Sequence, residues 1–290
     1  MSVEHAAQLI RAGKLVAFAT ETVYGLGANA LDADAVARIY DAKRRPRNSP
    51  LIVHVDSIEM ARGLASHWPE TAELLARHYW PGPLTLIVPK RDMIPDIVTA
   101  GLPTVGLRMP AHPVALELIR AAGVPIAAPS ANAFTELSPT HAAHVPEHLA
   151  DYILDGGPSM VGIESTVLSL VDRPRLLRPG VISLPEIEAL IGPVEVVSGA
   201  SDAAPHESPG QHARHYRPKT PVYLDRAPAG NGAWLRIGRE MPSDPKTYAA
   251  LLYYMLHRLD RENLDWIAIE SPPNTPEWAG VLDRLQRAAQ

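Results

Sequence analysis

Short apolar runs alternate with helix-like segments along most of the chain, from Leu15 to about Leu190. Runs of four to eight apolar or β-branched residues between turn-forming residues are typical of strands. The runs are Leu15–Ala19, Leu51–Val55, Leu84–Val88, Thr104–Leu107, Ile126–Ala128, Tyr152–Leu154, Thr166–Leu170 and Arg175–Leu177. The clearest helical spacings between them are at Ala33–Lys43, Thr71–Tyr79 and Pro113–Ala122. This pattern predicts an α/β (α+β) fold with a mixed sheet, but it does not determine the strand order.

The rhythm stops between about Ser198 and Lys219, where Gly, Ser, Pro and His replace periodic apolar residues. Such a composition is typical of a linker. Beyond it we expect strands and helices at Pro221–Leu224, Ala233–Ile237, Tyr248–Leu259, Trp266–Glu270 and Glu277–Ala289. The sequence therefore predicts a first domain over residues 1–197, a linker over 198–219 and a small α/β domain over 220–290.

The composition excludes several classes of protein. The 290 residues include no cysteine, so a disulfide scaffold, a thiolate metal site and a cysteine nucleophile are impossible. A formal net charge of −5 argues against a protein that coats nucleic acid non-specifically. No window approaches the roughly 18 apolar residues of a membrane span, and the N-terminus does not resemble a signal peptide. We therefore expect a cytoplasmic protein with no membrane contact.

Small polar residues and glycines follow the first predicted strand. The segment carries hydroxyls at Thr20 and Thr22 and closely spaced glycines at Gly25 and Gly27. At the carboxyl end of a strand these residue types suit a ligand crevice, which backbone and small side chains can line closely. A turn that needs glycine for backbone reasons would give the same pattern. The segment matches neither the phosphate loop nor the dinucleotide fingerprint.

A basic cluster ends the predicted helix at Ala33–Lys43. Four of the five residues from Lys43 to Arg47 are basic, and Pro46 and Pro50 restrict the backbone around them. A solvated helix C-terminus explains such charges through the helix dipole. Fixed guanidinium groups would equally suit a polyphosphate or a carboxylate. His54, in the next apolar run, fits either a core position or a ligand contact.

Further polar motifs occur at later strand ends. Arg108 ends an otherwise apolar strand, where a charge is costly unless it meets an anion. Small polar groups also occur at Ala128–Asn132, Asp155–Pro158, Gly162–Thr166 and Leu177–Gly180. Each motif is weak alone, but their recurrence favours a functional interpretation. The sequence contains no zinc-protease motif and no tight spacing of histidines and carboxylates, so we predict no metal site built by the protein. It also contains no serine-hydrolase elbow.

Together these segments resemble the threonylcarbamoyl-AMP synthase family, whose proteins have the YrdC-like fold. The matching runs follow the family's order: Thr20–Gly27, Ile39–Val55, Tyr79–Leu86, Thr104–Pro113, Ala128–Asn132, Ser138–Thr140, Leu154–Pro158, Gly162–Val167 and Leu177–Ser183. The segment from Ser208 to Pro218 is similar to the linker of the two-domain branch. Phe134 and Thr135 replace smaller residues, as do Arg44 and Arg47, and the C-terminal domain is shorter than the family suggests.

The resemblance implies a twisted mixed sheet with flanking helices and an enzyme of the nucleotidyltransferase class. Such an enzyme joins L-threonine, bicarbonate and ATP into threonylcarbamoyl-adenylate and releases pyrophosphate. A transferase machinery then modifies tRNA with the product. Magnesium is expected to arrive with the ATP phosphates. This chemistry needs no activated nucleophile, so positioning and charge stabilisation are the main catalytic effects.

The resemblance also implies residue roles by motif position. It places Lys43 and Arg45 in catalysis. It assigns threonine to Thr22, His54, Arg108 and Ser165. It assigns ATP to Arg45, Ser49, Thr104, Ala128, Ser130, Ser138, Arg178, Tyr216 and His215. The last two belong to the linker, which would act as a lid over the mouth of the site.

Two alternatives stay open at this point. One is a non-catalytic module of the same fold that binds double-stranded RNA or tRNA weakly through the basic residues from Lys43 to Arg47. It would show steeply salt-dependent binding without ATP turnover. The other is the carbamoyl-transfer domain of hydrogenase maturation proteins, which shares the fold but accompanies cysteine-rich zinc modules that this chain lacks.

Overall fold

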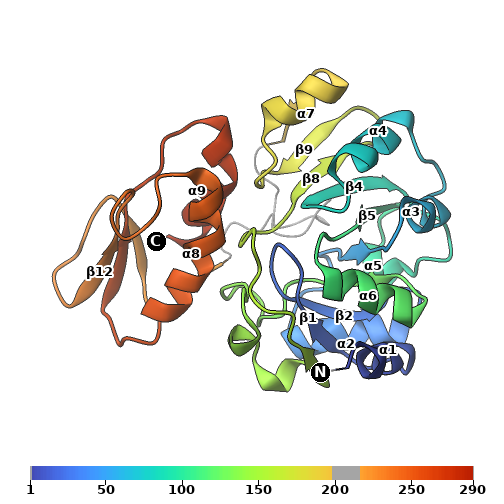
Figure 1. The fold of residues 1–290 in the computed structure, drawn as a ribbon, viewed down its shortest axis with the longest axis horizontal. Helices are drawn as coiled ribbons and strands as arrows, with labels where there is room; N and C mark the ends of the chain where they lie inside the picture. Colours follow the sequence, from blue (N-terminus) through green and yellow to red (C-terminus); the bar gives the residue numbers. More distant parts are fainter. Residues whose placement is uncertain (1, 198–215, 290) are drawn as a thin grey trace.

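The computed structural model describes residues 2–197 and 216–289. Figure 1 shows a large N-terminal lobe, built on one sheet with helices around it, and a smaller C-terminal lobe beside it. Most of the predicted linker, including His215, lies outside the described residues. None of the helices in the described ranges is long and apolar enough to cross a membrane.

Ten strands of the large lobe form one mixed sheet, in the order β10-β9-β8-β4-β5-β3-β6-β2-β1-β7. They are β1 (Val16–Phe18), β2 (Gly25–Asn29), β3 (Ile52–His54), β4 (Leu84–Pro89), β5 (Thr104–Arg108), β6 (Ile126–Ala127), β7 (Tyr152–Leu154), β8 (Thr166–Ser169), β9 (Arg175–Arg178) and β10 (Glu195–Val196). Parallel pairs such as β3–β5 and β4–β8 alternate with antiparallel pairs such as β4–β5 and β8–β9. The predicted mixed sheet is confirmed.

Helices flank the sheet of the large lobe, and some of them begin or end with typical capping residues. They are α1 (Val3–Arg11), α2 (Ala33–Lys43), α3 (Ile58–Leu64), α4 (Glu70–Tyr79), α5 (Asp96–Thr99), α6 (Pro113–Ala122), α7 (Leu184–Ile191), and the 3-10 turns η1 (Ala142–His144) and η2 (Glu147–Leu149). The Asp32 side chain caps α2 by accepting from the backbone of Asp34 and Ala35. A proline opens α6 and Gly123, in the left-handed conformation, ends it.

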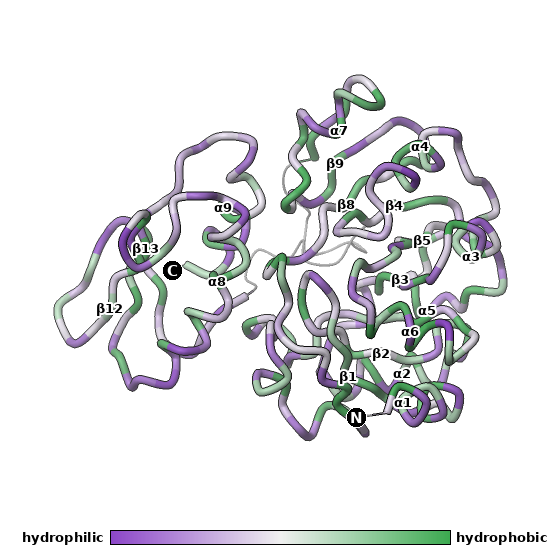
Figure 2. The backbone as a smooth tube through the Cα atoms, in the orientation of Figure 1, coloured by the Kyte–Doolittle hydropathy of each residue, from purple (hydrophilic) through white to green (hydrophobic). Residues whose placement is uncertain are grey.

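Two apolar clusters hold the helices of the large lobe on its sheet. In one, α1 and α6 pack with β1 through residues such as Ile10, Phe18 and Ile119. In the other, α2 and α4 pack with the central strands through residues such as Ile39 and Leu75. Figure 2 shows hydrophobic colour along the strands and polar colour in most connecting loops. This core fixes the strand ends that carry the site.

Strand β2 occupies part of the glycine-rich segment that the sequence associated with a turn or a crevice. It pairs antiparallel with β1, so that Gly27 lies opposite Val16. A Cβ at Gly27 would lie 2.7 Å from Phe18 and 2.8 Å from Ile126. Gly27 is therefore required for close packing, and only the preceding residues form the turn.

The small lobe has a three-stranded parallel sheet in the order β11-β13-β12. Its elements are β11 (Val222–Leu224), β12 (Gly232–Leu235), α8 (Pro245–Leu259), β13 (Trp266–Ile269), η3 (Pro276–Trp278) and α9 (Ala279–Ala288). The two long helices face the large lobe (Figure 1). This is the small α/β unit that the sequence predicted.

The two lobes share an apolar core. Val23 and Ile163 of the large lobe cluster with Tyr248 and Leu285 of the small lobe. The backbones also approach closely, because a Cβ at Gly280 of α9 would lie 2.6 Å from the carbonyl oxygen of Gly180. The large lobe therefore has its own core but also depends on α8 and α9 to cover part of its surface.

Candidate active site

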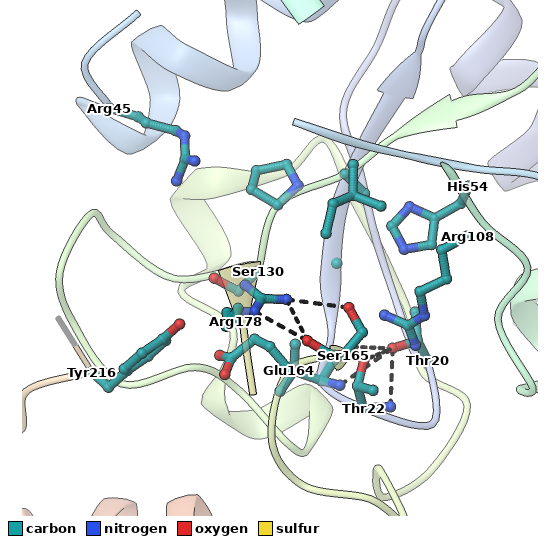
Figure 3. Close-up of a pocket in the computed structure, with 15 residues that line it drawn as sticks. Thr20, Thr22, Arg45, His54, Arg108, Ser130, Glu164, Ser165, Arg178 and Tyr216 are labelled. Carbon is teal, nitrogen blue, oxygen red and sulfur yellow. Dashed lines mark hydrogen bonds between the residues drawn. The ribbon is translucent and has the colours of Figure 1, made fainter. Parts of the chain in front are cut away.

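A pocket of about 550 Å3, including its mouth, opens where several strand ends of the large lobe meet. Figure 3 shows its lining, with His54, Arg108 and Thr20 on one side in this view and Arg45 and Tyr216 on the other. Nine predicted site residues line it: Thr22, Arg45, His54, Arg108, Ala128, Ser130, Ser165, Arg178 and Tyr216. The motifs recurring at strand ends therefore converge on one pocket.

Arg108 is held at one end of this pocket by the pairing of β5 with β3, which places it opposite His54. Its Nη2 atom lies 2.7 Å from Oε1 of Glu21, and both side chains are buried. Glu21 was not among the predicted site residues. The signal for it is a carboxylate between Thr20 and Thr22 in a segment of otherwise uncharged residues.

His54 is both a core residue and a pocket residue. Its ring packs edge-on against Phe18, with the ring centroids 6.1 Å apart, and it also lines the pocket. Burial, together with the positive charge of Arg108, lowers the pKa of His54 to about 3. The ring is therefore neutral near pH 7 and offers one donor and one acceptor.

The turn after β1 is organised by its own hydroxyls. Thr20 Oγ1 lies 2.9 Å from Thr22 Oγ1 and donates to the carbonyl oxygen of Val23 at 2.6 Å. It also accepts from the backbone amides of Thr22 and Val23. Such local bonds favour a turn over a continued strand. They hold Thr22 at the pocket wall.

Arg178 and Ser165 form a second polar group on the wall. Arg178 donates to the Ser165 carbonyl oxygen at 3.1 and 3.0 Å and to the Ser165 hydroxyl at 3.2 Å. That hydroxyl also lies 2.7 Å from the Thr85 hydroxyl. Burial lowers the pKa of Arg178, but an arginine stays charged at neutral pH. The pair fixes one cation beside one hydroxyl.

Arg45 is aimed by the segment that follows α2. The helix ends at Arg44, which adopts the left-handed conformation with φ of 51°. Arg45 Nη2 then donates to Ser49 Oγ at 2.5 Å and to the Pro50 carbonyl oxygen at 3.1 Å. Burial lowers the pKa of Arg45 to about 10, so the guanidinium remains charged near pH 7. Ser49 thus positions Arg45 and is not part of the lining.

Lys43 lies behind the pocket wall. Its ammonium donates to the carbonyl oxygens of Ser130, at 2.6 Å, and of Asn132, and burial lowers its pKa well below the usual value. It does not line the pocket. These contacts brace the loop that carries Ser130, and a direct role of Lys43 in catalysis stays a prediction.

The structure does not bring two other predicted residues into the lining. Thr104 is at the beginning of β5, the end opposite Arg108, and lines a separate hollow. The Ser138 hydroxyl donates to Oε1 of Glu164 at 2.6 Å. Their contacts with ATP stay predictions, while His215 lies outside the described residues.

Glu164 lines the pocket and was also missed by the sequence analysis. Burial opposes its ionisation, but the charges of Arg284 and Arg178 and a hydrogen bond from Ser138 lower its pKa. Glu164 is therefore an anion whose charge is compensated inside the protein. Its position directly before Ser165 was the available signal.

Three buried arginines, Arg45, Arg108 and Arg178, give the lining its positive charge. They are spread around the pocket, so the site suits a ligand set with more than one anionic group. Within residues 2–197 and 216–289, no three His, Asp or Glu side chains gather in a group that could hold a metal ion. The cationic side chains supply the positive charge seen in the lining.

Comparisons with known proteins cover both lobes. Residues 8–180 match the Sua5/YciO/YrdC family, described as "Telomere recombination", and residues 182–290 match "Threonylcarbamoyl-AMP synthase, C-terminal domain". The chain is 43% identical to the threonylcarbamoyl-AMP synthase of Bacillus subtilis, with 99% of this chain and 92% of that protein covered. It is 52% identical to the threonylcarbamoyl-AMP synthase of Pyrococcus abyssi, with 77% and 67% covered.

A solved structure shares the whole architecture. The crystal structure of P. abyssi Sua5 complexed with L-threonine superposes with a TM-score of 0.93 at 40% sequence identity. The match covers 99% of this chain and 94% of that chain. The small lobe, which resembled the family less clearly in sequence, is therefore part of the match.

Proposed function

Because the chain belongs to the threonylcarbamoyl-AMP synthase family, we propose that its pocket joins L-threonine, bicarbonate and ATP into threonylcarbamoyl-adenylate with release of pyrophosphate. The observation that carries this proposal is the presence of three buried arginines in one pocket that also holds neutral hydroxyls. The reaction brings together two anions, a carbamate and a triphosphate, and such a lining offsets their repulsion.

Threonine occupies the side of the pocket that holds Arg108. The guanidinium pairs with the amino acid carboxylate, and the neutral ring of His54 and the hydroxyls of Thr22 and Ser165 offer hydrogen bonds to the rest. A carboxylate here shares Arg108 with Glu21, so the arginine is held in place before the substrate arrives. Preorganisation of this kind reduces the ordering cost of binding.

ATP occupies the opposite side. Arg45 and Arg178 face the phosphates, and Ser130 and the backbone of Ala128 lie where a nucleotide would pass. The Tyr216 ring, which also lines the pocket, closes this side. Excluding water matters because the product is a mixed anhydride that water hydrolyses.

The proposed chemistry is two bond-forming steps. The threonine amine attacks the carbon of bicarbonate and, with loss of water, gives a carbamate. A carbamate oxygen then attacks the α-phosphorus of ATP, the bond to the bridging oxygen breaks, and pyrophosphate leaves. Arg45 offsets the charge that grows on the phosphates during the second step. No covalent bond to the protein is needed.

Magnesium enters this account as part of the ATP substrate. The lining is cationic apart from Glu164, whose carboxylate accepts hydrogen bonds from Ser138 and Arg284. Magnesium carried on the phosphates adds charge compensation without a protein ligand.

The product would then pass to a transferase that modifies tRNA, which places the reaction in the cytoplasm where ATP and tRNA meet.

The RNA-binding alternative is not favoured by the geometry. Lys43 and Arg45 are buried, so only Arg44 and Arg47 of the basic cluster face solvent. Modules that bind RNA rely on exposed cations for the phosphate backbone and on aromatic rings for stacking with the bases. Two exposed arginines beside one another are too few for that mode of binding.

A three-substrate assay tests the proposed function. The protein is incubated with MgATP, bicarbonate and threonine, and pyrophosphate release is followed while each substrate is omitted in turn. We expect release to require all three. Release that proceeds without threonine, or without bicarbonate, would contradict the proposal.

A further inference from the structure

Arg284, in α9 of the small lobe, crosses the boundary between the lobes. Its side chain is fully buried, and its Nε atom donates to Oε2 of Glu164 at 2.8 Å. Its Nη2 donates to the Glu164 carbonyl oxygen at 3.2 Å, and its Nη1 to the Pro179 carbonyl oxygen at 2.8 Å. One side chain of the small lobe is thus bonded at three points to the large lobe.

Glu164 connects this arginine to the pocket. It lines the pocket, and Ser138 donates to its Oε1 at 2.6 Å. Tyr253 of α8 donates to its Oε2 at 3.2 Å. The large lobe therefore bonds one carboxylate oxygen through Ser138, and the small lobe bonds the other through Tyr253 and Arg284.

Tyr216 is the second pocket residue that Arg284 reaches. The guanidinium carbon of Arg284 lies 5.4 Å from the centroid of the Tyr216 ring, a cation-π distance. The ring of Tyr253 packs against the same Tyr216 ring, with the two ring centroids 5.8 Å apart. Tyr216 has a φ of 61°, a conformation that a non-glycine residue adopts at a cost, so packing by its neighbours holds it there.

A purely structural ion pair is the simplest alternative. A buried ion pair is weak support for stability, because desolvation offsets much of the attraction. Two further features point to the pocket. Among the groups that Arg284 contacts, Glu164 and Tyr216 both line it, while Asp283 and the Pro179 carbonyl oxygen do not. Arg284 also compensates the charge of Glu164, as does Arg178, the other cation that lowers the pKa of this carboxyl group.

We propose that Arg284 is a positioning residue through which the small lobe holds the ATP side of the active site, by fixing Glu164 and Tyr216. The inference rests on the proposed function, because it assigns that side of the pocket to ATP. Among the proposed threonine contacts, Arg108 and His54 lie at the ends of β5 and β3 and Thr22 in the turn after β1, and only Ser165 adjoins Glu164 in sequence. The small lobe therefore acts on one substrate more than on the other.

The test compares ATP and threonine in the full-length chain. We expect Arg284→Met to raise the KM for ATP about tenfold or more, the equivalent of roughly 1.4 kcal/mol. The KM for threonine should change by less than about twofold. Calorimetric binding of MgATP without threonine should weaken by a similar factor. Arg284→Lys keeps the charge but not the fork of donors, so it should recover part of the loss.

Three variants complete the design. Arg258→Met removes an arginine of α8 whose partner, Glu262, lies just after the C-terminal end of this helix. This variant should behave like wild type. Glu164→Gln combined with Arg284→Met should be no worse for ATP than Arg284→Met alone, because both changes break one unit. If Arg284→Met does not fold, Tyr253→Phe, which removes only the bond to Glu164, should show the same selective effect on ATP at smaller size.

Selective loss of ATP binding supports the proposal. A lower melting temperature with an unchanged KM for ATP, or equal losses for ATP and threonine, would overturn it. A wild-type protein that binds MgATP but makes no threonylcarbamoyl-adenylate would instead refute the proposed function, and the calorimetric comparison would still report on Arg284.

Discussion

The guanidinium of Arg108 lies 2.7 Å from the carboxylate of Glu21, both groups are buried, and Arg108 lines the pocket. The arginine that faces the proposed amino acid substrate therefore has an internal counter-ion. An incoming carboxylate joins an existing pair, and Arg108 does not have to be desolvated when the substrate binds. Two predictions follow from this arrangement.

Replacing Arg108 by alanine should impair threonine binding selectively. Loss of a buried, charge-assisted pair costs on the order of 2–4 kcal/mol, which is at least about a 30-fold rise in the KM for threonine. The KM for ATP should change far less, because ATP lies on the other side. Steady-state kinetics with each substrate varied in turn measures both constants. Equal effects on the two would remove Arg108 from the threonine side.

Glu21→Gln should destabilise the folded protein, because it leaves Arg108 charged and buried without its partner. Breaking one side of a buried pair costs about 3–5 kcal/mol. Urea unfolding should show this as a lower midpoint with an unchanged slope. Adding Arg108→Gln should recover part of the loss. If Glu21→Gln unfolds at the wild-type midpoint, the pair contributes nothing to folding.

Arg45→Ala should slow pyrophosphate release while threonine binding is largely kept, because the charge that Arg45 offsets grows as the phosphate bond breaks. A loss of about 100-fold in kcat is expected for one preorganised donor. The matched control is Arg47→Ala, since Arg47 is in the same cluster but exposed and paired with Asp41. An Arg45 variant with wild-type turnover, or an Arg47 variant equally impaired, would contradict this role.

Folding stability should fall as the solution becomes acidic, through His144 and His257 at the lobe boundary. Their rings stack with centroids 4.0 Å apart. Burial and then positive neighbours lower the pKa of His144 to about 3. Burial lowers the pKa of His257 to about 4, although its hydrogen bond with the Ser138 carbonyl oxygen opposes this shift. His141, Arg261, Asp260 and Tyr254 surround them. In the unfolded chain a histidine titrates near 6.5.

Between about pH 4 and 6.5 the unfolded chain binds more protons at these histidines than the folded chain does. The free energy of unfolding is therefore highest above pH 6.5 and decreases as the pH falls towards 4. Melting temperatures from pH 7.5 to 5 measure the loss. His257→Gln should flatten part of this slope, while His144 and His54, whose pKa values are both about 3, maintain the rest. An unchanged slope in that variant would exclude His257 as a contributor.

Local patterns predicted most elements, because capping and apolar spacing act over a few residues. Helix α2 has the predicted bounds, since Asp32 caps its start and its apolar residues repeat at helical spacing. Strand β2 was missed because its glycines resemble a turn. Gly27 is required because a Cβ there would collide with Phe18 and Ile126, and Ile126 is distant in sequence. Strand order likewise depends on pairings that no local pattern contains.

The candidate site shows the same division. Nine of the residues that the family resemblance assigned to the site line one pocket. Glu21 and Glu164 were missed because their partners, Arg108 and Arg284, are far along the chain and the ion pairs exist only after folding. The resemblance also placed Lys43 in catalysis, and in the structure its ammonium donates to backbone carbonyl oxygens behind the pocket wall, so that role stays a prediction.

Product analysis with labelled bicarbonate tests the central claim most directly. The protein is incubated with MgATP, threonine and carbon-13 bicarbonate, and the products are separated and weighed by mass spectrometry. We expect threonylcarbamoyl-adenylate that carries one labelled carbon, with one pyrophosphate released for each molecule formed. The same product should be nearly absent with Arg108→Ala. Adenylate formed on the threonine carboxylate itself, with no labelled carbon, would contradict it.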